Sequence, residues 1–150
     1  MNELIAAGGG FLLAVLWMDL IFDVQVLRHA RAADPLPEPV LASIAAYYRR
    51  ATTDSRPMSR LVALAMVVTV LGSAWQLAGG EGALLARSAA LLLCASPAAL
   101  AAARVVPNAV RLGARADDPA AQSALARAIC RDHLLCFASI GAFLALRIAL

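Results

Sequence analysis

The chain has 150 residues, of which 62% are hydrophobic and 15% are charged, and its formal net charge is +3. Soluble domains carry about 45–50% apolar and about 25% charged residues, so this composition excludes an ordinary soluble domain and favours a small integral membrane protein. The positive charge is small and dispersed, which excludes nucleic acid as the expected partner and leaves the lipid bilayer.

Four apolar segments are long enough to cross the hydrocarbon core of a bilayer, which takes about 20 helical residues. They cover approximately residues 4–23, 60–78, 83–106 and 130–149, and a helical stretch, SALARAICRDH, leads into the last. None of them alternates apolar and polar residues as the strands of a membrane barrel do. The sequence therefore predicts an all-α fold: an integral membrane four-helix transmembrane bundle, in a single transmembrane domain covering residues 1–150.

The linker between the first two spans contains VLASIAAYYRR, which has apolar residues at helical spacing and follows a proline-rich turn. This pattern predicts a short helix at the cytoplasmic interface, where Tyr47, Tyr48 and the following arginines can anchor it. The linker between the last two spans predicts a short loop and then a helix that begins near Asp118.

Arginines indicate the orientation of the spans. The first and third linkers are rich in arginine, whereas the turn AGGEGA between the second and third spans has none before Arg87. The positive-inside rule then places both long linkers in the cytoplasm and both termini outside. We expect a multi-pass protein of a bacterial inner (cytoplasmic) membrane. The start, MNELIAAGGG, lacks a signal-peptide pattern, so the first span is expected to stay in the mature protein.

Two carboxylates interrupt the first span. Asp19 and Asp23 are four residues apart and therefore share one face of a helix. From Glu3 on the outside, Asp19 lies about 24 Å and Asp23 about 30 Å along the helix, so both belong to the cytoplasmic half. A charge at the bilayer centre costs at least about 2.5–3.5 kcal/mol, which turns such side chains toward the bundle interior and a partner.

Polar side chains of the other spans converge at the same depth. Arg104 and Asn108 lie at the cytoplasmic end of the third span, and His133 lies at the entry to the fourth. We expect one polar site open to the cytoplasmic side, with Asp19 as general base or ligand and His133 and Asn108 as catalytic residues beside it. The residues expected to bind or position the substrate are Asp23, Arg104, Tyr47 and Tyr48.

The segment after the third span carries a family resemblance. It reads RVVPNAVRL, continues through the acidic linker ADDPAA and reaches His133 at the entry to the fourth span. This arrangement resembles the second half of the DUF1772 membrane proteins, which are small four-span proteins and include the anthrone oxygenases. Their pattern matches here at Pro107, Asn108, Leu112 and His133. The chain lacks the threonine between proline and asparagine, and an arginine shortly after the histidine.

The resemblance implies an oxidoreductase, specifically a monooxygenase-type reaction of molecular oxygen with an apolar phenolic substrate at the cytoplasmic leaflet. A carboxylate or His133 would remove a proton from the substrate, and Asn108 with an arginine would stabilise the resulting negative charge. The reaction would use either no cofactor or a divalent metal such as iron. In the metal-dependent alternative, the ligands would be Asp19, Asp23 and His133.

Other classes of function stay open at this stage. An intramembrane carboxylate also suits a proton- or ion-coupled small transporter, and the Gly8–Gly10 run permits the close helix contacts of a homo-oligomer. A structural membrane subunit would use Asp19 or Asp23 only in an ion pair with Arg104 or Arg60. The three cysteines form no CxxC pair and are expected to serve in packing.

Overall fold

The computed structural model describes residues 2–29, 35–79 and 82–149. The elements follow in this order: α1 (Asn2–Asp23), η1 (Val24–Arg28), α2 (Glu38–Tyr48), η2 (Arg49–Asp54), α3 (Arg56–Gly79), α4 (Leu84–Leu100), η3 (Ala101–Val105), α5 (Val106–Ala114) and α6 (Pro119–Ala149). η1 is a 3₁₀ turn, and η2 and η3 are π-helical turns. The described residues contain no strand, which confirms the all-α class.

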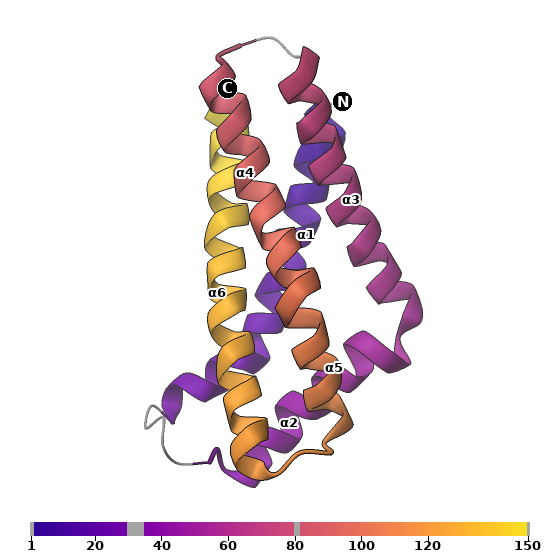
Figure 1. The fold of residues 1–150 in the computed structure, drawn as a ribbon, viewed down its shortest axis with the longest axis vertical. Coiled ribbons are helices and arrows are strands. Elements are labelled where there is room, and N and C mark those ends of the chain that lie inside the picture. The colour runs from indigo at the N-terminus through magenta and orange to yellow at the C-terminus, as the bar shows by residue number, and fades with distance from the viewer. Residues whose placement is uncertain (1, 30–34, 80–81, 150) are drawn as a thin grey trace.

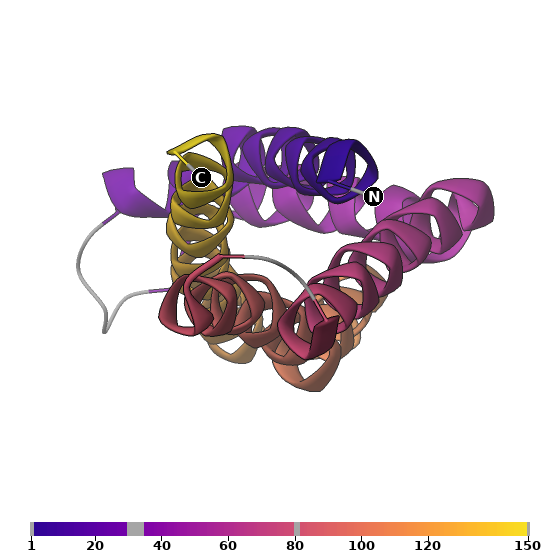
Figure 2. The ribbon, with the colours of Figure 1, turned by 90° about the horizontal axis from the view of Figure 1, so that it is seen from above.

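Four continuous helical stretches are long and apolar enough to cross a membrane: Asn2–Arg28, Arg56–Gly79, Leu84–Ala114 and Pro119–Ala149. They stand side by side as a four-helix bundle, and the start of α1 and the end of α6 lie at the same end (Figure 1). Figure 2 shows the four helices around a common axis. The four-span bundle expected from hydropathy is therefore confirmed.

The third span does not end where the sequence suggested. The apolar segment predicts an end near residue 106, but the helix continues through α5 to Ala114. Pro107 lies in the first turn of α5, directly after the π-helical turn η3, and this wider turn accommodates the proline within the continuous helix.

The fourth helix also begins earlier than residue 130. α6 starts at Pro119, and the Asp118 carboxylate accepts hydrogen bonds from the backbone N–H groups of Ala120 and Ala121, both at 2.9 Å. An aspartate in this position caps a helix N-terminus, and proline suits the first helical residue. The cap therefore fixes the start of α6, in agreement with the helix expected near Asp118.

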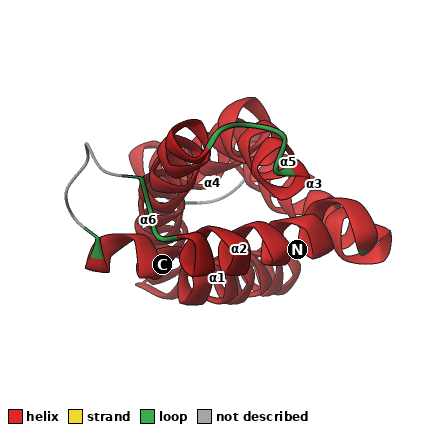
Figure 3. Cartoon of the chain, turned by 90° about the horizontal axis from the view of Figure 1, so that it is seen from below, coloured by secondary structure: helices red, strands yellow, loops and turns green. Residues whose placement is uncertain are grey.

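The short helix α2 closes the end of the bundle opposite the termini. It crosses below α1 and packs against α5, α6 and η2 (Figure 3). Its buried residues Leu41, Ile44 and Tyr48 join one apolar cluster with Leu112 and Ile129, and a second cluster lies further along the bundle. The helix expected in the first linker is thus present, and it places two tyrosines beneath the bundle.

Two residues of the glycine run serve packing within this chain. A Cβ atom added to Gly8 would collide with Thr69 of α3, and one added to Gly9 would lie 2.9 Å from the ring of Phe143 on α6. Gly10 has open space around it. Gly8 and Gly9 therefore let α1 approach α3 and α6 closely, so packing inside the chain accounts for them.

Gly113 brings α5 against η2. A Cβ atom there would lie 2.9 Å from the backbone nitrogen of Arg49 and 3.1 Å from its Cα atom. Backbone cannot yield as a flexible side chain does, so Gly113→Ala is expected to lower the free energy of unfolding by roughly 1–3 kcal/mol. The measurement is unfolding in mixed detergent micelles. Gly141→Ala is the control, because nothing lies within 4 Å of its added Cβ atom; equal stability of the two variants would contradict the prediction.

Candidate functional site

Five polar side chains from three helices meet at the α2 end of the bundle, and we call them the polar cluster. α1 supplies two carboxylates, α2 supplies two phenols and α6 supplies one imidazole: Asp19, Asp23, Tyr47, Tyr48 and His133. They are brought together because α2 crosses under α1 and α6 passes beside both (Figure 3). The expected convergence around Asp19 and His133 is therefore present.

Asp23 is the centre of the cluster and has 0% exposure. Its Oδ1 accepts a hydrogen bond from the Tyr48 hydroxyl at 2.6 Å, and its Oδ2 lies 2.7 Å from Nδ1 of His133. A carboxylate only accepts hydrogen bonds, so it selects the imidazole tautomer with the proton on Nδ1. In neutral His133 the other nitrogen, Nε2, is consequently the acceptor.

Asp19 lies one helical turn away and has a different environment. The Tyr47 hydroxyl donates a 2.6 Å hydrogen bond to its Oδ1, while its Oδ2 lies 3.7 Å from Nε2 of His133. The ring of Tyr47 stacks on Phe22 with their centroids 4.1 Å apart. Asp19 and Nε2 of His133 thus form a pair. Tyr47 positions Asp19 by a hydrogen bond, and Asp23, which is itself bonded to Tyr48, positions His133.

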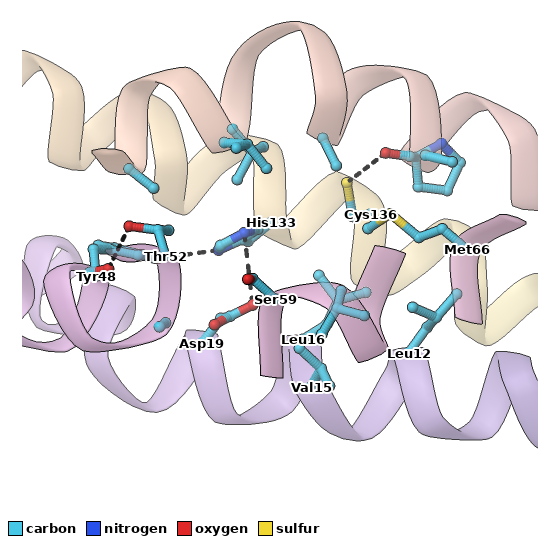
Figure 4. Close-up of a pocket in the computed structure, with 18 of the residues that line it drawn as sticks. Leu12, Val15, Leu16, Asp19, Tyr48, Thr52, Ser59, Met66, His133 and Cys136 are labelled. Carbon is cyan, nitrogen blue, oxygen red and sulfur yellow. Dashed lines mark hydrogen bonds and ion pairs between the residues drawn. The ribbon is translucent and has the colours of Figure 1, made fainter. Parts of the chain in front are cut away.

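An apolar cavity of about 220 Å³ begins at this pair. Asp19, Tyr48 and His133 lie toward one end of the cavity, and Leu12 and Met66 lie toward the other (Figure 4). His133 and Ile140 both line the cavity, and the α6 helix rises by about 10 Å between them. The remaining lining residues are almost all apolar or small: Val15, Leu16, Ala51, Thr52, Met58, Ser59, Val62, Cys94, Pro97, Ala98, Ala101, Val105, Val106, Ala109, Val110, Cys136 and Tyr47.

The polar and apolar groups of the cavity are unevenly distributed. No arginine lines it in the part of the chain that the structure describes, and its polar groups are concentrated around the two carboxylates and the imidazole. Asp23 already accepts two hydrogen bonds, and Asp19 accepts one. The site therefore suits an apolar molecule that brings a hydrogen-bond donor, such as a hydroxyl group, to Nε2 of His133 and Asp19.

The electrostatics of the cluster keep the two tyrosines protonated. Burial raises the pKa of Tyr47 and of Tyr48, and the neighbouring Asp19 and Asp23 carboxylates raise both further. A tyrosine in water is half ionised near pH 10. Both phenols therefore remain hydrogen-bond donors to the carboxylates throughout the physiological range.

This shift predicts a simple alkaline titration. The sequence has two tyrosines in all, so the folded protein is expected to show no tyrosinate absorbance at about pH 10, where a free tyrosine is half ionised. Absorbance spectra recorded from neutral to alkaline pH give the result, and the denatured protein is the control. Half-ionisation of the folded protein near pH 10 would show that the phenols are not held by the carboxylates.

Arg104 does not join the polar cluster. Its guanidinium lies 3.2 Å from the carboxylate of Asp132, which is buried and also lies 3.3 Å from Arg131. The expectation that Arg104 pairs with Asp19 or Asp23 is therefore wrong. Asp132 and His133 are adjacent on α6 and about 100° apart around it, so the carboxylate meets Arg104 while the imidazole faces the cavity. Asp132 is the carboxylate that the sequence analysis did not assign.

Asn108 also lies away from the cavity. It is half-buried on α5 and is absent from the residues that line the cavity. The helix continues past Pro107, so Asn108 lies within α5 and not at the end of the span. Sequence reasoning missed Cys136, although it follows His133 by three residues and so shares its helix face.

The cluster does not have the arrangement of a metal centre. Within residues 2–29, 35–79 and 82–149, no three His, Cys, Asp or Glu side chains are placed to hold a metal ion together. Nδ1 of His133 is engaged with Asp23, and of the three proposed ligands Asp23 does not line the cavity. Two of the proposed ligand residues, His133 and Asp19, therefore face the cavity.

The cysteines are free and buried, as expected of packing residues. Cys94 and Cys136 also line the cavity, and Cys130 lies in the apolar cluster beside α2.

No protein-family model matches the chain, and no curated protein or solved structure shows significant similarity to it.

Proposed function

We propose that the protein is a membrane-embedded oxidoreductase of the anthrone-oxygenase type that acts on an apolar phenolic molecule bound in the cavity. One observation carries the proposal: Nε2 of His133, with Asp19 beside it, is the free acceptor at the polar end of an apolar cavity. The resemblance of the segment around Pro107 to His133 to the DUF1772 proteins supports the reaction type.

His133 acts as the general base in this proposal. Nε2 takes the acidic proton of the substrate, and the buried Asp23 carboxylate stabilises the imidazolium through the 2.7 Å contact at Nδ1. The imidazolium then offers its Nε2–H to the substrate anion, so the negative charge has a donor although no described arginine lines the cavity. Asp19 replaces Asn108 and Arg104 as the second polar residue at the reacting group.

The anion is electron-rich enough to react with molecular oxygen at the ring carbon. The overall change converts a ring CH₂ group and O₂ into a C=O group and H₂O, so atoms and electrons balance without another reductant. The apolar lining excludes water from the anion until oxygen, which is itself apolar, has reacted.

The membrane context of the proposal follows from the arginines. Among the described arginines, all except Arg87 and Arg147 belong to the first or third linker or adjoin these linkers. We place that end in the cytoplasm by the positive-inside rule, with both termini outside, in a bacterial inner membrane. The polar cluster then lies in the cytoplasmic leaflet.

The test is oxygen consumption by the detergent-purified protein with anthrone as the substrate. We expect anthrone-dependent uptake of O₂ that is lost in the double variant Asp19→Asn/His133→Ala. Elemental analysis of the same samples separates the alternatives. Stoichiometric metal that is lost in the variant would replace the proposed base mechanism with metal-dependent oxidation, and no uptake by the wild-type protein would remove the proposed activity.

A further inference from the structure

The cavity is not closed on all sides. Met58 of α3 and Val106 and Val110 of α5 line it, and yet they are 48%, 49% and 45% exposed. A residue that both lines a cavity and is exposed stands at its mouth. We call the gap between these three residues the lateral opening.

The opening exists because α3 leans away from α5. α3 packs against α1 and α4 and, at its start, against η2. Figure 2 shows α3 diverging from α5 toward the α2 end of the bundle. Residues from η2 form the floor of the gap, because Ala51 and Thr52 also line the cavity.

The surface around the opening belongs to two membrane-spanning stretches. Met58 lies in the stretch Arg56–Gly79, and Val106 and Val110 lie in the stretch Leu84–Ala114. All three side chains are apolar, so lipid covers them instead of water. The opening therefore faces the bilayer sideways, near the ends of the spans, where the exposed Arg56 and Arg60 can reach toward headgroups.

We propose that the cavity is filled from the bilayer: an alkylated phenol dissolved in the membrane enters between α3 and α5 with its hydroxyl group first and leaves its alkyl tail in the lateral opening. This inference rests on the proposed function for the choice of a phenol. The hydroxyl group meets His133 and Asp19 at the polar end, and the tail lies along Met58 and Val110 in contact with lipid chains.

An alkylated phenol suits both the polar end of the cavity and the bilayer from which it enters. A phenol concentrates at the interface, with its ring in the apolar region and its hydroxyl group toward the headgroups. The cavity offers carboxylate and imidazole acceptors and no described arginine, which disfavours carboxylate or phosphate headgroups. A cation would also meet the carboxylates, but it would lose its hydration in an apolar cavity whose carboxylates are already hydrogen-bonded.

The experiment is photo-crosslinking in proteoliposomes with an alkylphenol that carries a diazirine on its tail. We expect cross-links on the peptides that contain Met58 and Val110, mapped by mass spectrometry. Unmodified para-nonylphenol should compete for this labelling roughly tenfold better than nonylbenzene, the factor that one hydrogen bond provides. Labelling that spreads over lipid-facing residues such as Leu64 and is not competed would overturn the inference.

A steric variant tests the route itself. Val110→Trp fills the opening and should reduce competed labelling of the Met58 peptide several-fold. Val67→Trp is the matched control, because Val67 is 52% exposed on α3 and does not line the cavity. Circular dichroism and gel filtration show whether both variants fold as the wild-type protein does. The cross-linked peptides of the wild-type protein test the inference even if a variant fails to fold. An undiminished signal in a folded Val110→Trp protein would overturn the route.

The outcomes separate this inference from the proposed function, because labelling needs neither oxygen nor turnover. Competed labelling without anthrone-dependent oxygen uptake would keep the lateral entry and remove the proposed reaction. Oxygen uptake without labelling at the opening would keep the reaction and overturn lateral entry. Competition by nonylamine and not by para-nonylphenol would overturn the inference that a phenol occupies the cavity and would indicate a site for lipophilic cations.

Discussion

Replacing Asp23 with alanine is expected to lower the free energy of unfolding by about 2–6 kcal/mol, because two buried hydrogen-bond donors lose their acceptor at a cost of about 1–3 kcal/mol each. The carboxylate is fully buried and accepts hydrogen bonds from Tyr48 and His133. Its removal leaves a phenol and an imidazole without their acceptor in an apolar environment, where each unmatched donor is costly. Unfolding in mixed detergent micelles gives the value, and a loss below about 1 kcal/mol would contradict the geometry.

Asp23→Asn separates the catalytic role from the structural one. Asparagine has nearly the same shape, so we expect a smaller loss of stability. Its amide supplies a donor as well as an acceptor, so Nδ1 of His133 is no longer fixed as N–H. In the comparable triad arrangement of serine proteases, this change lowers kcat about 10⁴-fold, and we expect about 10³–10⁴-fold here. Nitrogen NMR of His133 reports the tautomer directly, without an activity assay.

The outcome for the two aspartates shows what helical spacing can and cannot predict. A separation of four residues correctly indicated that Asp19 and Asp23 share a face. It could not show that Asp23 is completely buried and that only Asp19 lines the cavity. That difference arises because α2 crosses beneath α1, so Tyr48 reaches Asp23 while Tyr47 reaches Asp19. The angle at which α2 crosses depends on tertiary packing that the pattern of one helix does not contain.

Hydropathy predicted the four spans because burying apolar length in lipid dominates the energetics of such segments. The ends of the spans depended on local backbone features that hydropathy does not report. The π-helical turn η3 accommodates Pro107 within the continuous helix, and Asp118 caps α6 well before the apolar residues begin. Asn108 was predicted to join the site because the span was expected to end beside it, and the continuing helix carries it away from the cavity instead.

Charge counting predicted that arginines and acids would pair in the cytoplasmic half, but it could not choose the pairs. Asp19 and Asp23 were the candidate partners of Arg104, but the structure pairs Arg104 with Asp132. The choice depends on the rotation of α6 about its axis, which also directs His133 into the cavity. Among the described residues, no arginine forms an ion pair with Asp19 or Asp23, and the imidazole of His133 is the basic group beside both.

His133→Gln is expected to reduce anthrone-dependent oxygen uptake by about 10²–10⁴-fold, the range that a positioned general base contributes. Glutamine can donate a hydrogen bond to Asp23, but its amide cannot take a proton at neutral pH. His29→Gln is the matched control, because His29 lies at the end of η1 and does not line the cavity. We expect that control to retain full activity.

Asp19→Asn shows whether His133 or Asp19 is the general base. If His133 is the base, the variant keeps the hydrogen bond from Tyr47 and loses only the charge beside Nε2, so part of the activity should remain. If Asp19 were the base, Asp19→Asn would be as inactive as His133→Gln. The pH dependence of the residual activity adds an independent readout: in the first case activity still falls on the acid side, because protonation of His133 abolishes proton removal from the substrate.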